Sequence, residues 1–208
     1  MDTNNPAELR IVEGAEELFS RYGLKSVTMD DIARHVGMSK KTLYQHFTDK
    51  TQIIQAVMKT TMHRQEECML EFQKTAKDPV QEMVMMMQFL EKTFRRYNPN
   101  LFYDMQKHHP EVWNMFREFK VTCALENIIN NIERGKAQGL YRKNVNSKIL
   151  GLIRLEEVEF AMDPAIFPPD KFTITDVQIQ MLEHFLHGIC TLRGHRLVNK
   201  YLQIHDEE

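Results

Sequence analysis

Cysteine is scarce in this 208-residue chain: Cys68, Cys123 and Cys190 lie far apart and form no C-x-x-C pair. An odd number of widely spaced cysteines is not a disulfide framework and fits a reducing compartment. The sequence also lacks a run of about 18 apolar residues, which a membrane-spanning helix needs, and its first ten residues lack the apolar core of a secretion signal. We therefore expect a cytoplasmic protein that has no membrane partner.

Patterns typical of strands are also absent, because apolar residues recur at helical spacing along most of the chain. No nucleophile, base and orienting group occur together, so the sequence gives no support for an enzyme. Prolines and caps divide the pattern into segments, and Thr175 opens the last long helix. We predict an all-α fold with helices over 49–77, 79–97, 101–108, 111–135, 147–162 (capped by Ser147) and from 175 to about 192.

The most informative stretch is 27–47, which reads as two short helices joined by a turn at Gly37. Thr28 is a suitable N-cap for the first helix, and Ser39 for the second. Leu43 and Phe47 repeat at helical spacing and are expected to face inward. The stretch therefore predicts a helix-turn-helix motif, which points to DNA.

The outer face of the second helix is polar and basic. Lys40 and Lys41 in its first turn oppose the helix dipole, which destabilises the helix by roughly 0.3–1 kcal/mol for each lysine. Beside phosphates the same two charges would become favourable. Between residues 32 and 50 there are four Lys or Arg and one acid, although the whole chain has a net charge of −2. This concentration of positive charge indicates a compact DNA footprint. The alternative is a solvated basic face on an ordinary helical hairpin.

These segments, together with the helix before them, resemble the TetR family of bacterial transcriptional repressors. The resemblance covers 11–23, 27–33, 37–39 and 42–47 and ends at Asp49 and Lys50. It implies that the second hairpin helix reads the major groove, that Tyr44 and Lys50 hold the DNA backbone, and that Thr28 offers its amide and hydroxyl to a phosphate. The DNA-contacting residues expected from it are Thr28, Ser39, Lys40, Lys41, Thr42, Tyr44, Gln45, His46 and Lys50.

Asp30 departs from this expectation, because it occupies a position that approaches DNA in some relatives and an acid cannot bind phosphate. We assign Asp30 to the terminus of the first hairpin helix. Lys40 and Lys41 favour guanine if they reach base edges, whereas Gln45 favours adenine. The resemblance further implies two domains, a DNA-binding domain over 1–52 and a helical effector-binding and dimerisation domain over 53–208.

The middle of the chain is rich in methionine and aromatic residues. Because members of the TetR family commonly enclose a small effector here, the resemblance implies a ligand cavity near Met86, Phe89, Leu90, Phe102, Tyr103, Trp113 and Phe116. An ordinary core filled with methionine is the alternative for any one of these residues. No cofactor is expected.

Two polar clusters contain residue types that can ligate a metal. The first is Asp104, His108, His109 and Glu111, in which Pro110 interrupts the shared helix face. The second is His184, His187 and Cys190, for which a place in the core or at an interface fits better. Neither pattern is typical of a metal site, so no metal is expected.

Two helices near the C-terminus carry apolar stripes and could pair with the same helices of a second chain into a four-helix bundle. Such a homodimer presents two reading helices to half-sites roughly 34–36 Å apart, or a multiple of this, in an inverted repeat. Gly188 permits close helix crossing, or is merely tolerated. The interface expected is Leu152, Leu182, Phe185, Gly188 and Ile189.

The sequence thus predicts a homodimeric repressor of the TetR type, which binds double-stranded DNA and is released from an inverted-repeat operator by a small apolar effector. The alternative keeps the DNA-binding motif but replaces the effector with a protein partner, or with constitutive binding.

Overall fold

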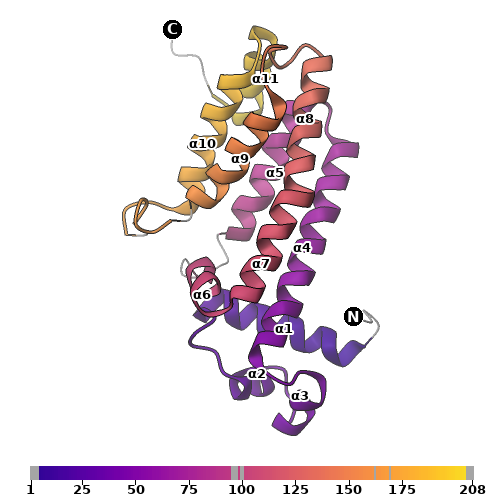
Figure 1. The fold of residues 1–208 in the computed structure, drawn as a ribbon, viewed down its shortest axis with the longest axis vertical. Coiled ribbons are helices and arrows are strands. Elements are labelled where there is room, and N and C mark those ends of the chain that lie inside the picture. The colour runs from indigo at the N-terminus through magenta and orange to yellow at the C-terminus, as the bar shows by residue number, and fades with distance from the viewer. Residues whose placement is uncertain (1–4, 95–97, 99–100, 162, 169, 205–208) are drawn as a thin grey trace. The chain divides into compact units, whose positions relative to one another are not determined.

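The structure is a computed structural model that describes residues 5–94, 98, 101–161, 163–168 and 170–204. Within these ranges the chain is helical, and no strand occurs apart from an isolated bridge between Tyr141 and Cys190 (Figure 1). The predicted all-α class is therefore confirmed. The helix ends predicted at 97 and 162 lie outside the described residues.

The helices follow one another along the chain with short connections. They are α1 (Pro6–Tyr22), α2 (Met29–His35), α3 (Lys40–His46), α4 (Lys50–Thr75), α5 (Pro79–Phe94), α6 (Leu101–His108), α7 (Pro110–Phe119), the π-helical turn η1 (Lys120–Ala124), α8 (Leu125–Ala137), α9 (Ser147–Phe160), α10 (Ile174–Ile189) and α11 (Leu192–Leu202). The chain forms two compact units, 1–64 with 96–118 and 65–95 with 119–208. The functional boundary predicted at residues 52 and 53 falls within α4 and stays a prediction.

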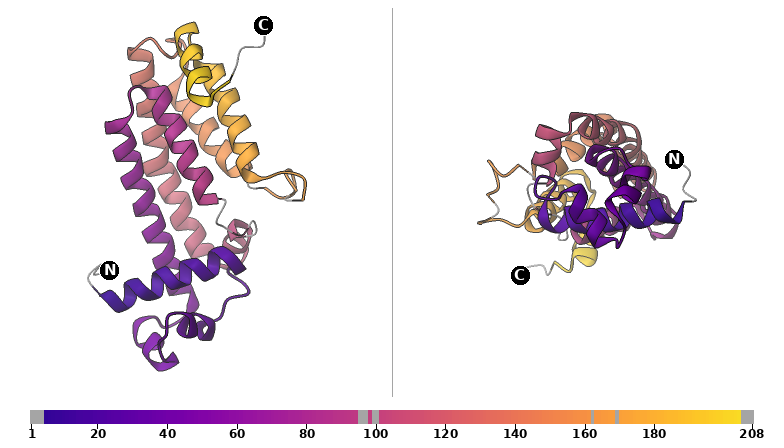
Figure 2. Two further views of the ribbon diagram at one scale, coloured as in Figure 1. Left: turned by 180° about the vertical axis from the view of Figure 1, so that it is seen from behind. Right: turned by 90° about the horizontal axis from the view of Figure 1, so that it is seen from below.

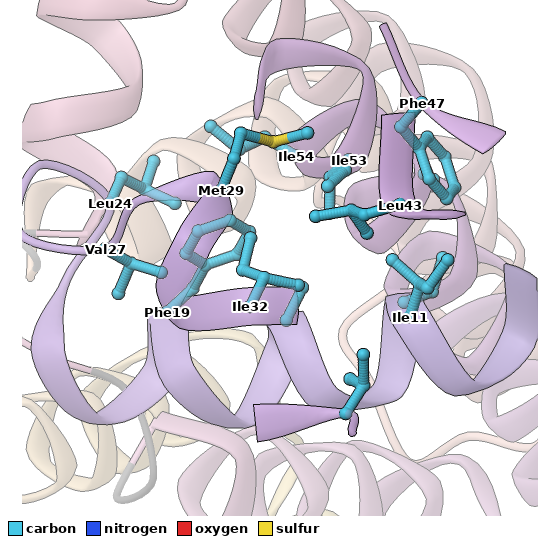
Figure 3. Close-up of a cluster of buried hydrophobic side chains, with 14 of the residues drawn as sticks. Ile11, Phe19, Leu24, Val27, Met29, Ile32, Leu43, Phe47, Ile53 and Ile54 are labelled. Atoms are coloured by element: carbon cyan, nitrogen blue, oxygen red, sulfur yellow. The ribbon is translucent and has the colours of Figure 1, made fainter. Parts of the chain in front are cut away.

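The first unit is built around one hydrophobic core. Figure 3 shows Ile11, Phe19, Ile32 and Leu43 projecting into it from α1, α2 and α3. Three buried residues from α6 and α7, far away in sequence, belong to the same core: Leu101, Met105 and Val112. The hairpin is therefore supported by α1, by the start of α4 and by the α6–α7 segment.

Local side-chain chemistry explains where the short helices begin. The Thr28 hydroxyl accepts a hydrogen bond from the Asp31 amide at 3.2 Å, and the Ser39 hydroxyl accepts one from the Thr42 amide at 3.0 Å. Gly37 lies between the two helices with φ +66°, a conformation that L side chains rarely adopt. The predicted caps and turn are confirmed.

The second unit consists of the rest of α4 with α5, η1 and α8–α11, and Figure 2 shows these helices from two further directions. Its main core joins α5, α8, α10 and α11 around Val80, Leu182 and Leu186. Gly135 on α8 lies against the ring of the fully buried Tyr141, so closely that a Cβ at residue 135 would be 2.0 Å from a ring carbon. The Tyr141 hydroxyl donates to the Asn131 side chain at 3.1 Å.

Two helix starts and the interior of one helix differ from the prediction. The cap of α9 is Asn146 rather than Ser147, because the Asn146 side chain accepts from the Lys148 and Ile149 amides at 3.1 Å. The cap of α10 is Thr173, two residues before the predicted start. The helix predicted over 111–135 contains the π-helical turn η1.

The structure also has a helix that the sequence reading missed. The chain is extended at Cys190 and Thr191, and the Thr191 hydroxyl accepts from the Gly194 amide at 3.3 Å, so that α11 begins anew. Thr191 has neither Pro nor Gly directly beside it, so the sequence gave little sign of this break.

Candidate nucleic-acid interface

The two faces of α3 differ as expected from its sequence. Leu43 is fully buried on the inner face, and Phe47 follows it into the core. On the outer face Lys41, Tyr44 and Gln45 are exposed, and among the described residues they have no hydrogen-bonding or ion-pair partner. These three polar groups are therefore available to a ligand outside the chain.

The remaining polar residues of this region already have partners. The hydroxyls of Ser39 and Thr42 lie 2.7 Å apart, which is hydrogen-bonding distance. His46 is half-buried, with Nδ1 3.5 Å from a carboxylate oxygen of Glu8 on α1. The first contact lies within the N-terminal cap of α3, and the second joins the end of α3 to α1.

Lys40 forms an ion pair that the sequence reading did not anticipate. Its Nζ lies 2.7 Å from Oδ1 of Asp30 on α2. The hydrogen bond to Asp30 and the negative charge of that carboxylate raise the pKa of the Lys40 ammonium. Asp30, which we assigned to the helix terminus, thus forms an ion pair with a lysine of α3.

The hydrogen-bond donors of Thr28 also have an acidic partner within the chain. Its amide and its hydroxyl both donate to Oδ2 of Asp31, at 3.0 and 2.6 Å. These hydrogen bonds lower the pKa of Asp31. The two donors that were predicted to bind phosphate are therefore engaged in the capping box of α2, and a phosphate must share or replace the carboxylate.

The Lys50 ammonium binds backbone carbonyls within the chain, which nothing in the sequence indicated. Its Nζ donates to the backbone carbonyls of Leu24 and Val27 at 2.9 and 3.0 Å, and burial lowers its pKa. The ammonium thereby holds the loop before α2 against the start of α4. The predicted phosphate contact of Lys50 stays a prediction, and the hydrogen bonds to described residues leave one of its three N–H donors for it.

The residues predicted for an effector divide between the two units. In the second unit Met86 packs against Met69 and Leu155, while the rings of Phe89 and Phe72 meet edge to face at 6.2 Å; Leu90 is half-buried. In the first unit the Phe116 ring lies 5.6 Å from Phe102 and 5.5 Å from Trp113, and Tyr103 is exposed beside Lys107.

The residues predicted for a dimer interface are not all at the surface. Leu182, Phe185 and Ile189 are buried in the core of their own chain, so a folded chain does not present them to a partner. Leu152 and Gly188 are exposed. The apolar stripe of α10 was predicted to face a second copy of the chain, whereas it lies in a core shared with residues of α5, α8 and α11 of the same unit.

The polar clusters do not assemble a metal-binding group of three or more His, Cys, Asp or Glu in the described part of the chain. His109 Nδ1 lies 3.4 Å from the Thr51 hydroxyl. The pKa of His109 is lowered mainly by burial and also by the positive charge of Lys50. His187 and His195 stack with their Nδ1 atoms 2.6 Å apart. Among the described helices, none combines the length and the hydropathy that a membrane span requires.

A family model described as "Bacterial regulatory proteins, tetR family" matches residues 11–57, from α1 into α4. This segment belongs to the TetR family. The HTH-type transcriptional regulator SrpR of Pseudomonas putida is 37% identical to it over 54 residues, which are 26% of this chain and 25% of SrpR. The chain spans between a quarter and two-fifths of the length of the curated relatives that it matches over this segment.

Solved structures extend the TetR likeness to the whole fold. A transcriptional regulator from Cytophaga hutchinsonii superposes with a TM-score of 0.75 at 21% identity, covering 90% of this chain and 100% of that one. Thermus thermophilus FadR, a TetR family transcriptional repressor in complex with lauroyl-CoA, gives 0.60 at 17% identity, covering 88% and 95%. The predicted TetR-type helix-turn-helix domain followed by a larger helical domain is thereby confirmed.

Proposed function

We propose that this chain is a homodimeric transcriptional repressor, which binds an inverted-repeat operator through α3 and is released by a small apolar effector. The observation that carries this proposal is the outer face of α3. Lys41, Tyr44 and Gln45 are exposed there without partners among the described residues, while Leu43 on the opposite face is fully buried. Such a face offers a cation, an aromatic hydroxyl and an amide to one ligand, which suits phosphates and base edges.

Dimerisation is supported by an apolar stripe on α9. Ile149, Leu152, Ile153 and Phe160 recur at helical spacing and are 39–55% exposed. Exposed apolar side chains gathered along one helix mark an interaction surface. A second copy of the chain is the occupant that fits a DNA-binding helix, because two copies present two α3 helices to a symmetric operator.

Selection of DNA from a random pool of duplexes tests this part of the proposal. We expect the purified protein to enrich an inverted repeat whose half-sites are roughly 10–10.5 base pairs apart, or a multiple of this, centre to centre. We also expect binding to weaken steeply with salt, because phosphate contacts release counterions. Failure to bind any duplex at low ionic strength would exclude the proposal, and enrichment of unsymmetrical sites would exclude the dimer.

We propose that the methionine and aromatic side chains of α5, α6 and α7 bind the effector that releases the protein from DNA. Their soft, adaptable groups suit an apolar molecule, and the structurally similar Thermus thermophilus FadR is in complex with lauroyl-CoA. The effector residues that we propose are those named from the sequence: Met86, Phe89, Leu90, Phe102, Tyr103, Trp113 and Phe116.

Heating the protein with a panel of apolar compounds tests the effector. We expect at least one compound to raise the melting temperature, since ligand binding to the native state stabilises it by mass action, and the same compound to weaken operator binding. A protein that binds its operator but is stabilised by no compound of the panel would instead favour gating by a protein partner or constitutive binding.

A further inference from the structure

Two neighbouring acids at the start of α2 have different partners. Asp31 receives both Thr28 donors and completes the capping box of its own helix. Asp30 lies one residue earlier and points to the next helix, where its Oδ1 is 2.7 Å from Nζ of Lys40. Since Asp31 already provides the acid of the capping box, Asp30 is not required for it.

The Asp30–Lys40 pair is exposed at the start of α3, the helix that we propose to bind DNA. Both side chains are more than half exposed, at 53% for Asp30 and 59% for Lys40. The first turn of α3 contains no acidic residue, so Asp30 supplies the negative charge there from a different helix. Lys41, the next residue, is exposed without such a partner among the described residues. Lys41 should therefore attract a phosphate more strongly than Lys40, whose charge is offset by Asp30.

We propose that Asp30 is a specificity-determining residue for DNA binding. It neutralises Lys40 and repels phosphates of any sequence, so that it weakens binding to unrelated DNA more than binding to the operator. The inference rests on the proposed function of α3.

Electrostatics gives the reason for this difference. Binding to unrelated DNA depends on neutralising phosphates and releasing their counterions, and a lysine that already has a carboxylate partner releases fewer. Binding to the operator has an additional contribution from hydrogen bonds to base edges, for which Lys41 and Gln45 are available. A repulsive element that acts on all sequences therefore raises the ratio of operator affinity to non-operator affinity.

Asp30→Asn is the direct test, because it removes the charge and keeps the size. The probes are the duplex enriched from the random pool and a scrambled duplex of equal length and composition. We expect affinity for the scrambled duplex to rise roughly two- to five-fold per protomer at low salt, and the dependence of log K on log salt to steepen by about one per protomer. Operator affinity rises less, so the discrimination ratio falls.

Two lysine variants provide a matched comparison. Lys41→Ala is expected to reduce the salt slope by about one per protomer, whereas Lys40→Ala reduces it much less, because the charge of Lys40 is already neutralised. In the Asp30→Asn background Lys40→Ala should show the full reduction. If Asp30 had only a structural role, the effect of Lys40→Ala on the salt slope would be the same with and without Asp30→Asn. Glu13→Gln, which removes an exposed carboxylate from α1, controls for the change in overall charge.

The inference and the proposed function fail in different ways. If the wild-type protein discriminates the operator but Asp30→Asn leaves both the salt slope and the discrimination ratio unchanged, the inference is overturned and the repressor proposal stands. It is also overturned if the variant loses operator affinity while its affinity for the scrambled duplex stays constant. If the wild-type protein binds neither duplex, the proposed function itself is wrong. Unchanged thermal unfolding of Asp30→Asn confirms that the variant is folded.

Discussion

Phe47→Ala is expected to lower the free energy of unfolding of the first unit by about 3–5 kcal/mol and to abolish operator binding. Phe47 is 1% exposed, directly follows α3 and packs into the core that Ile11, Leu43 and Ile53 share. Replacing the ring by a methyl group removes this burial and leaves a cavity at the end of α3. Denaturant unfolding monitored by circular dichroism gives the loss of stability, and a mobility-shift titration gives the loss of binding.

Tyr44→Ala is the matched control on the same helix. Tyr44 is 44% exposed on the outer face, so its removal should change the free energy of unfolding by no more than about 0.5 kcal/mol. Its affinity for the operator should nevertheless fall, because the aromatic hydroxyl is among the groups proposed to contact DNA. Equal destabilisation by both variants would contradict the assignment of an inner and an outer face to α3.

The features of the first unit that were predicted correctly are local in sequence. Thr28 and Ser39 cap helices within three residues of themselves, and Gly37 adopts a positive φ in a turn between two short helices. Cap and turn chemistry depends on neighbours along the chain. The sequence was therefore sufficient to predict α2, the turn and α3.

Partner choice between elements could not be predicted in the same way. Asp31 has the spacing of a capping box with Thr28, but no spacing along the chain indicates that Asp30 pairs with Lys40. The hydrogen bonds from the Lys50 ammonium to carbonyls more than twenty residues away were not predicted either. These choices depend on how α2, α3 and α4 pack, which the spacing of residues along the chain does not specify.

The C-terminal helices show a related limit. An apolar stripe such as Leu182, Phe185 and Ile189 indicates a buried face, but it does not say whether the covering surface belongs to the same chain or to a second copy. In the structure the α10 stripe lies in a core that also contains residues of α5, α8 and α11 of the same chain. For α9 the exposed residues Ile149 and Ile153 indicate a surface that the described part of the chain leaves uncovered.

Arg134→Met is expected to lower the free energy of unfolding of the second unit by about 3 kcal/mol. The Arg134 guanidinium on α8 donates to both carboxylate oxygens of Glu82 on α5, at 2.7 and 2.6 Å. The Glu82 side chain is only 5% exposed, whereas that of Arg134 is 34% exposed. Removing the arginine leaves a buried charge without its cation, which costs more than removing a charge that reaches solvent. Denaturant unfolding measures the difference.

Two further variants separate the ion pair from general effects of the substitution. Arg196→Met changes an exposed arginine on α11 and should alter stability by no more than about 0.5 kcal/mol. The double variant Glu82→Met with Arg134→Met should recover much of the loss, because replacing both partners of a buried pair by apolar groups is often neutral. A loss that persists undiminished in the double variant would show that packing of the two side chains, rather than the unpaired carboxylate, joins α5 to α8.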